Sequence, residues 1–382
     1  MGKNFCVVLG ARLRRARESF GLTLQEVAGK LGFNNYQALS SIEDGSRQVK
    51  AHELAALSKI YFKDIAYFIQ DEQQEVQAEL VLWRNAGQDH KVRMEKEGEL
   101  VKYCRQYFEL EKKLGLPYQS SLRRYLDNTN DFSYFKAEEL AGEVSRDMQL
   151  GARPALCLEK ILEQRYNVKI LYLDFDKSGS GACAVGGFGS AVLINSRETP
   201  WRRNYDLAHE LFHLITWGKF PERNADAPCD TADIVEKWAN TFASVLLLPG
   251  DQVKAEVEKR LVNKKVEDIE LIKIAREFAV SIDALIWRLV NLRYIRFEDA
   301  EEWLNKPEIR ALDKLERVAD KNKAPYISEK YVGLAFEAYQ KGMISKGKLA
   351  EYLNIPRPEL ENKLKAYGYD VEEVYNGTLA LT

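Results

Sequence analysis

Cysteine is scarce and scattered in this sequence. Its 382 residues include five cysteines, which lie far apart and form no CxxC pair. A disulfide framework or a zinc ribbon needs paired cysteines, so this distribution excludes both. An odd number of unpaired cysteines favours a reducing compartment.

Long apolar runs are also missing. No stretch approaches the roughly 18 apolar residues that span a membrane, and the opening MGKNFCVVLG has too short an apolar run for a secretory signal. We therefore expect a cytoplasmic protein with no membrane partner. With 46% hydrophobic and 30% charged residues, the composition is that of a globular protein, and the length indicates two or three domains.

The charges are unevenly distributed, although the formal net charge is only −2. Residues 1–70 contain ten Lys and Arg against six Asp and Glu, so this segment is basic and the remainder is acidic. A basic segment on an acidic body indicates a polyanion as the partner of that segment alone.

The basic segment contains two short helical patterns in succession. LTLQEVAGKLGF (22–33) has Thr23 as its N-cap, and YQALSSIEDG (36–45) ends at Gly45. This length and order predict a helix-turn-helix, whose second helix enters the major groove of DNA. The runs LTLQEVAGKLG, SIEDG and HELAALSKIY resemble the XRE (Cro/cI-like) helix-turn-helix family over about residues 10–70. Leu24 departs from the pattern, because the family often has a phosphate-contacting Gln there.

The resemblance implies which side chains meet double-stranded DNA. Gln37 and Ser41, on the exposed face of the second helix, are the expected base readers, since an amide pairs with adenine through two hydrogen bonds. Asn35, Arg47 and Lys50 are the expected phosphate contacts. Binding to an operator as a homodimer is typical of such domains. The alternative is a helical bundle that serves protein contacts or dimerisation only.

The next segment, residues 73–136, is expected to be a helical linker. Apolar residues recur at helical spacing between Asp89 and Leu114, and Gly115 and Pro117 end the pattern. This helix is predicted to act as a spacer or a dimerisation arm.

From Glu138 the pattern is mixed, with helices, strands and glycine-rich turns. VKILYLDF (168–175) and AVLIN (191–195) are predicted strands, and TPWRRNYDLAHELFHLITWG is a predicted helix. This helix carries His209, Glu210 and His213, with the two histidines on one face and one turn apart. That spacing suits zinc, because two imidazoles converge on one ion while the glutamate between them reaches a water molecule as general base. The alternative is a polar interruption of a core helix.

The third metal ligand must come from a residue other than histidine. The chain has four histidines, and His52 and His90 lie outside the body, so a three-histidine site there is excluded. The best carboxylate is Glu236 in the helical pattern VEKWANTFASVLLLP, which would complete a His2Glu site. Asn240, one turn later, would accept the ring N–H of a ligand histidine and fix its tautomer. Three other carboxylates remain alternatives to Glu236: Asp226, Asp230 and Asp233.

NYDLAHELFHLI followed by ExxANxFAxxLLLP resembles the ImmA/IrrE family of zinc metallopeptidases, and the similarity extends from Glu138 to about Leu292. The resemblance implies a cytoplasmic gluzincin-like endopeptidase that binds Zn2+ and cleaves a helix-turn-helix repressor in a stress or mobile-element response. Asp206 replaces the Thr usual before LAHE, and aspartate also caps helices. AVLIN is expected to hold substrate as an added strand, and Tyr205 or Arg203 to stabilise the oxyanion.

The expected fold is mainly α with a small β-sheet (α+β). We predict a helix-turn-helix DNA-binding domain at 1–72, the linker at 73–136, a metallopeptidase domain at 137–305 and a helical C-terminal region at 306–382. Within that region, residues 342–368 resemble a degenerate helix-turn-helix, and a packing cap is the alternative. The predicted function is a transcriptional regulator that binds operator DNA and cleaves a repressor or itself. The alternative is a transcription factor whose metal-binding body senses a signal and does not cleave.

Overall fold

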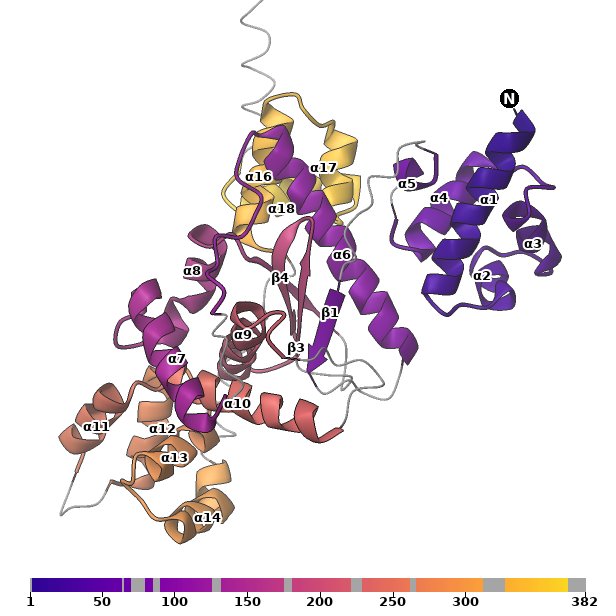
Figure 1. Cartoon of the computed structure of the whole chain (residues 1–382). Helices are drawn as coiled ribbons and strands as arrows, with labels where there is room; N and C mark the ends of the chain where they lie inside the picture. Colours follow the sequence, from indigo (N-terminus) through magenta and orange to yellow (C-terminus); the bar gives the residue numbers. More distant parts are fainter. Residues whose placement is uncertain are drawn as a thin grey trace, which may run out of the picture. The chain divides into compact units, whose positions relative to one another are not determined.

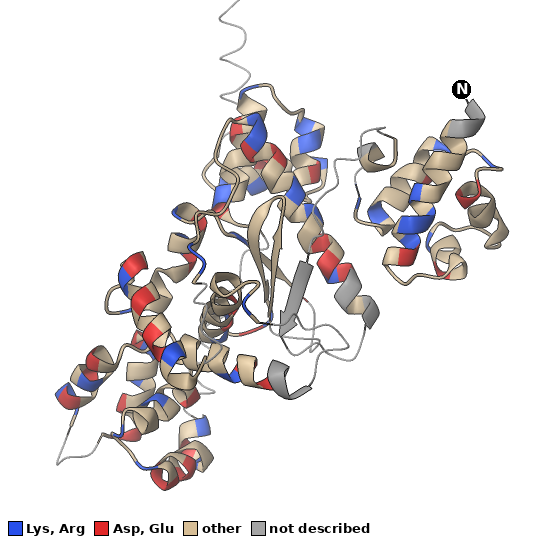
Figure 2. Cartoon of the chain, viewed as in Figure 1, with Lys and Arg blue, Asp and Glu red and all other residues tan. Residues whose placement is uncertain are grey.

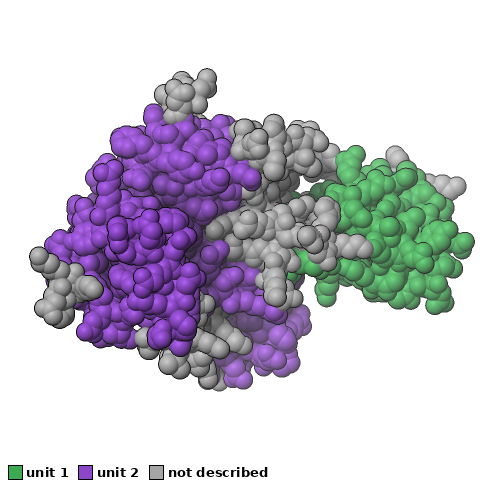
Figure 3. Space-filling model, turned by 90° about the horizontal axis from the view of Figure 1, so that it is seen from below, with its two compact units in different colours: residues 1–79, 86–106 green, residues 80–85, 107–382 purple. Residues whose placement is uncertain are grey.

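The computed structural model describes most of the chain, which divides into two compact units. The described segments are residues 2–63, 65–69, 80–84, 90–125, 132–174, 181–220, 229–261, 266–311 and 327–369. The first unit comprises residues 1–79 and 86–106, and the second comprises residues 80–85 and 107–382 (Figure 3). Among the helices of the described segments, none combines the length and the apolar character of a membrane span.

The first unit is built from helices around one apolar core. Leu13, Leu39 and Leu57 come from three different helices, and all three are fully buried in that core. The helix predicted between Asp89 and Leu114 is confirmed, and its residues up to Gln106 belong to this unit. The helices are α1 (Gly2–Ser19), α2 (Leu24–Lys30), α3 (Gln37–Glu43), α4 (Ala51–Ile60), α5 (Ile65–Ile69) and α6 (His90–Lys113) (Figure 1).

Local signals in the sequence set the start of α2 and the end of α3. The Thr23 hydroxyl accepts the Glu26 amide N–H at 3.2 Å, and the Glu26 carboxylate accepts the Thr23 N–H at 2.9 Å. Gly45 follows α3 with a φ of +76°, a conformation that glycine adopts at low cost. Val27 is fully buried on the inner face of α2. The helix–turn–helix arrangement predicted for these residues is therefore confirmed.

A buried ion pair joins α1 to α3. Arg17 Nε donates to Glu43 Oε1 at 2.8 Å, and Arg17 Nη2 donates to Glu43 Oε2 at 3.0 Å. The two side chains are only 11% and 5% exposed, and hydrogen bonding to Glu43 raises the pKa of Arg17. Each charge depends on the other, because either one alone would be costly in this position.

The second unit contains a four-stranded sheet with the order β1-β3-β4-β2. Its strands are β1 (Leu80–Arg84), β2 (Lys169–Leu173), β3 (Gly181–Gly186) and β4 (Gly189–Asn195). β3 pairs antiparallel with both β1 and β4, and β4 pairs parallel with β2. The predicted strands at 168–175 and 191–195 are thus present as β2 and β4.

Helices cover one face of the sheet and supply most of the core of the second unit. Val192 and Ile194 of β4 share one buried cluster with Leu211 and Phe242 from two of these helices. The expected α+β architecture is therefore confirmed. The helices of this layer and its extension are α7 (Tyr134–Met148), α8 (Leu158–Gln164), α9 (Pro200–Ile215), α10 (Cys229–Leu247), α11 (Gly250–Lys259), α12 (Asp268–Glu277), α13 (Ile282–Asn291) and α14 (Phe297–Asn305) (Figure 1).

The strand pairing corrects two expectations. β4 is hydrogen-bonded to β3 on one side and to β2 on the other, so the prediction that residues 191–195 hold substrate as an added strand is wrong. β1 lies within residues 73–136, where only a helical linker was expected. Its partner β3 is distant in the sequence, and local periodicity carries no information about such a pairing.

The C-terminal helices pack onto the body of the second unit. They are α16 (Glu329–Gln340), α17 (Lys346–Tyr352) and α18 (Leu360–Ala366). Lys330 Nζ donates to the Glu163 carbonyl at 2.8 Å and to Asn167 Oδ1 at 2.7 Å. The Tyr331 and Tyr107 rings lie 5.2 Å apart. These are the contacts of a packing cap.

The buried pair between α1 and α3 gives a test of stability. Glu43→Ala removes the carboxylate partner of Arg17, so we expect the free energy of opening α1 to fall by about 3 kcal/mol or more. Native-state hydrogen exchange of the α1 amides in the full chain measures this value. Glu18→Ala is the control, because Glu18 is half exposed, pairs with Arg14 at 2.9 Å and only more loosely with Arg17 at 3.4 Å, so its loss should cost far less. Equal losses from both substitutions would show that the buried pair has no special importance.

Candidate metal centre

The HELFH segment lies in the second half of α9. The helix begins at Pro200, whose missing N–H and fixed φ suit a first helical turn. His209 and Glu210 are buried, with 0% and 1% of their surface exposed, whereas His213 is half-buried. Polar side chains at this depth need partners, because an uncompensated buried charge is costly.

Asp206 does not cap this helix, contrary to expectation. It lies in the middle of α9, and its carboxylate is fully buried. The partner is Arg202, one turn earlier, whose Nε lies 3.2 Å from Asp206 Oδ1. The helix begins at Pro200, well before the LAHE run, so Asp206 lies too far inside it to act as a cap.

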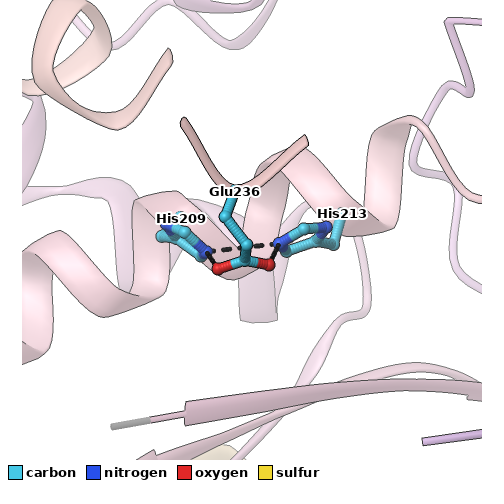
Figure 4. A group of neighbouring side chains, drawn as sticks. All are labelled: His209, His213 and Glu236. Atoms are coloured by element: carbon cyan, nitrogen blue, oxygen red, sulfur yellow. Dashed lines mark hydrogen bonds and ion pairs between the residues drawn. The ribbon is translucent and has the colours of Figure 1, made fainter. Parts of the chain in front are cut away.

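Three side chains from α9 and α10 converge at one point (Figure 4). His209 Nε2 lies 3.2 Å from Glu236 Oε2, His213 Nε2 lies 3.2 Å from Glu236 Oε1, and the two Nε2 atoms are 3.2 Å apart. The structure thus brings together the three residues that the sequence analysis selected. Of the alternative carboxylates, Asp233 is exposed, while Asp226 and the side chain of Asp230 lie outside the described residues.

The spacing of these donors fits a tetrahedral metal ion. Metal–ligand bonds of about 2.1 Å in a tetrahedron put neighbouring donors about 3.4 Å apart, close to the 3.2 Å found between each pair. Burial raises the pKa of Glu236, but hydrogen bonds with His209 and His213 outweigh burial and hold that pKa well below its usual value. Glu236 is therefore an anion, and the donor set can hold a divalent cation.

Asn240 orients the buried histidine. Its Oδ1 lies 3.1 Å from His209 Nδ1. A proton on Nδ1 completes that hydrogen bond and leaves the Nε2 lone pair facing the other donors. Tyr205 Oη donates to the Asn240 backbone carbonyl at 2.9 Å, which ties α9 to α10 at the same level. Asn240 thus lies where the sequence analysis placed it.

The Glu210 side chain lies against β3 of the sheet. A methyl group added to Gly181 would lie 3.1 Å from Glu210 Oε1, so this close approach depends on glycine. Cys183 is fully buried on the same strand and interacts electrostatically with the Glu210 carboxylate. Burial, and then the charge of Glu210, raise the pKa of Cys183 well above its usual value. The sequence analysis missed both β3 residues, although strand alternation places them on one face.

A groove of about 360 Å3 adjoins the centre between α9, α10 and α13. Its lining includes Trp201, Tyr205, Asn240 and Trp287. Asn240, which lines the groove, also contacts His209, whereas the three donor residues are not part of the lining. The aromatic and amide side chains give it the mixed character of a site for a peptide or small molecule.

The two residues expected to stabilise an oxyanion lie in different surroundings. Tyr205 lines the groove beside Asn240. Arg203 lies with its guanidinium 5.8 Å from the centre of the Tyr172 ring, on the side of β2. Tyr205 is therefore the better placed of the two.

The expected DNA-contacting residues occupy the turn and the second helix of the first unit. Gln37 is exposed at the start of α3, and Lys50 is exposed just before α4. Asn35 is exposed, and its Oδ1 accepts the Ala38 amide N–H at 3.3 Å. Ser41 is half-buried. Gln37 and Lys50 are thus the most accessible members of the set.

Arg47 is engaged within the first unit. Its Nη2 donates to Glu53 Oε1 at 2.6 Å, and its guanidinium lies 5.4 Å from the centre of the Phe33 ring. The pair with Glu53 is largely buried on the glutamate side. These contacts give Arg47 a structural role, and its phosphate contact remains a prediction.

Basic residues lie along α1 (Figure 2), and three of its arginines have partners within the unit. Arg12 Nη1 donates to the Phe68 carbonyl at 2.9 Å, and Arg14 pairs with Glu18 at 2.9 Å. With Arg17 paired to Glu43, much of the basic charge of α1 serves the fold.

Comparisons with known proteins identify both units. The family model described as a helix-turn-helix domain matches residues 8–61, and the IrrE N-terminal-like domain, a peptidase family, matches residues 163–290. No curated protein sequence matches the chain. Among solved structures, it is similar to a Mycobacterium tuberculosis transcriptional regulator, with 14% identity and a TM-score of 0.30 over 48% of this chain and 51% of that chain. The match thus spans about half of that regulator. The chain joins a helix-turn-helix domain to an IrrE N-terminal-like peptidase domain.

Proposed function

We propose that the chain is a DNA-binding transcriptional regulator whose second unit is a zinc-dependent endopeptidase. The observation that carries this proposal is the convergence of His209, His213 and Glu236, whose donor atoms all lie within 4.8 Å of one another, with Glu210 buried on the same helix. The match to a peptidase family supports the same reading. The substrate is a protein, and the joined helix-turn-helix domain favours a repressor of that class or the chain itself, in a stress or mobile-element response.

The residues of the centre have distinct roles in this proposal. The two histidines and Glu236 would hold zinc, which when bound would supply a Lewis acid for a peptide carbonyl and for a water molecule. Glu210 takes a proton from the attacking water and passes it to the leaving amine. Asn240 holds the His209 tautomer that leaves Nε2 free to bind. Gly181 leaves room for the Glu210 carboxylate against β3, because a Cβ at that position would lie 3.1 Å from Glu210 Oε1.

The groove supplies room for the side chains of a peptide. Trp201 and Trp287 offer apolar ring surface, and Arg202 and Asp283 provide both signs of charge in the same lining. A protein segment with aromatic or aliphatic side chains beside the cleaved bond fits this lining. Tyr205 is the proposed donor to the developing oxyanion, a role in which its hydroxyl would leave the Asn240 carbonyl to which it donates in this structure.

The first unit supplies the DNA reader. Residues 8–61 match a helix-turn-helix domain, and α3 carries exposed Gln37 at its start. We propose that Gln37 and Ser41 read base edges, and that Asn35, Arg47 and Lys50 contact phosphates. A homodimer on a two-fold symmetric operator is the proposed binding state.

The metal assignment predicts a specific loss of zinc. Glu236→Ala should lose most of the bound zinc, because it removes one of three ligands. Asn240→Ala should weaken binding by roughly 10-fold to 100-fold, the usual effect of a residue that orients a ligand histidine. Lys237→Ala is the control, because Lys237 is exposed beside Glu236 and should keep full affinity. Calorimetric titration of metal-stripped protein measures all three. Full zinc binding by Glu236→Ala would move the third ligand elsewhere.

The role of Glu210 predicts that binding and cleavage can be separated. Glu210→Gln removes the carboxylate that carries the proton and keeps both histidines and nearly the same shape. Zinc and DNA binding should survive, while cleavage of candidate repressors or of the chain falls at least about 100-fold. Mass spectrometry of timed incubations with zinc measures the cleavage. If the parent chain cleaves nothing and Glu210→Gln still switches transcription normally in cells, the second unit is a metal-dependent sensor.

The DNA reader makes a prediction about specificity. Gln37→Ala should weaken binding to the preferred operator by about 1–3 kcal/mol and relax the choice of one base pair. Lys50→Ala should instead weaken all DNA alike and reduce the salt dependence by about one phosphate contact. Fluorescence anisotropy with operator and scrambled duplexes at several salt concentrations separates the two effects. A chain that binds neither duplex would leave the first unit as a protein-interaction module.

A further inference from the structure

The proposed general base lies against one particular strand of the sheet. Gly181 approaches Glu210 so closely that a Cβ there would be 3.1 Å from its carboxylate, and Cys183 is fully buried two residues further along the same strand. Both residues belong to β3. A peptide bond presented to Glu210 from the sheet side must therefore pass along β3.

An extended peptide binds most readily to a sheet by pairing with an open strand edge. One edge of β3 is taken by β4, which is itself paired on both sides. The outer edge of β3 is thus the edge nearest to Glu210 on which a substrate strand would form. In this structure β1 occupies it, with Arg84 opposite Gly181, Leu82 opposite Cys183 and Leu80 opposite Val185.

We propose that β1 is an internal inhibitor, which fills the peptide-binding edge of β3 and keeps the peptidase latent. The inference rests on the proposed peptidase function. It identifies the substrate as a segment that binds in an extended conformation, antiparallel to β3. In the latent state, residues 80–84 of the same chain occupy that edge.

The position of β1 in the sequence gives the inhibitor a direct link to the DNA reader. Residues 80–85 belong to the second unit, although residues 1–79 before them and 86–106 after them belong to the first. Any change in the first unit that draws these flanking residues away would remove β1 from β3. Binding of the first unit to DNA, or its release from DNA, would thereby change the activity of the proposed peptidase.

A short strand suffices as an inhibitor when it is part of the same chain. A covalently linked segment competes at an effective concentration on the order of millimolar. A protein substrate at micromolar concentration would need to bind the β3 edge about a thousandfold more tightly to displace it. Pairing of the five residues of β1 would therefore keep the enzyme latent. So short a strand can also dissociate from β3.

Two opposite variants of the full chain test the proposal. Val81→Pro with Leu82→Pro weakens the pairing, because proline has no N–H and every second residue of an antiparallel strand donates to its partner. Leu80→Cys with Val185→Cys places two thiols on directly opposed residues, at a separation that suits a disulfide. The first variant releases β1, and oxidation of the second locks it. Reduction of the locked variant by a phosphine is the matched control.

The first readout is cleavage of labelled casein and of the chain itself with zinc. We expect the released variant to cleave at least about tenfold faster than the parent chain, and the oxidised locked variant to be slower, with recovery on reduction. The second readout needs no catalysis. In a Glu210→Gln background, a fluorescent peptide with the sequence ELVLWRN, which is that of residues 79–85, should bind the released variant at least about tenfold more tightly than the oxidised locked variant.

The two readouts separate this inference from the function on which it rests. Equal peptide binding by the locked and released variants would overturn the inference, whatever the cleavage rates. Measurable cleavage by the parent chain that does not rise on release, with hydrogen exchange showing β3 amides newly exposed, would also overturn it. Peptide binding confined to the released variant, with no cleavage by any variant, would support the occupied edge and count against the peptidase.

Discussion

The meeting of His209, His213 and Glu236 is the constraint on which the second unit depends. Two imidazoles and a carboxylate, with donor atoms 3.2 Å apart, would repel or strain one another without a shared cation or proton. The surrounding groups are arranged to keep them in place. Asn240 fixes the ring of His209, and the Tyr205 hydroxyl ties the two helices together at that level. The core of the unit is thus organised around a polar centre.

The sheet has a second function beyond support of α9. β3 brings Gly181 against Glu210, so the proposed base contacts the sheet. The same strand pairs with β1 along its outer edge. In the proposals made above, base positioning, substrate binding and latency all depend on this one strand. The helix-turn-helix domain of the first unit would then bring the proposed chemistry to a DNA site.

The parts of the site that follow from local spacing could be predicted from the sequence. His209 and His213 share a face because they lie four residues apart on a helix, and the helical pattern of α10 placed Glu236 and Asn240 one turn apart. The Thr23 cap and Gly45 likewise marked the helix-turn-helix through residues close in sequence. In each case a periodic pattern and its end signals lay within one short segment.

The parts that depend on distant pairing could not be predicted. Whether AVLIN lies at an edge or in the interior of the sheet depends on which strands pair with it. β1 comes from a segment that the sequence analysis expected to be helical. Cys183 lies near Glu210 only because β3 packs against α9, and the sequence does not show that contact. The ion pair of Arg47 with Glu53 could not be predicted either, because it forms only when α4 is folded beside Arg47.

The most direct test of the central claim is X-ray absorption at the zinc K edge of the zinc-loaded full chain. The account predicts a nearest shell of nitrogen and oxygen only, at about 2.0–2.2 Å, with the outer scattering of two imidazoles. A sulfur neighbour at about 2.3 Å would place a cysteine on the metal. That result would contradict both the proposed ligand set and the position of Cys183 near Glu210.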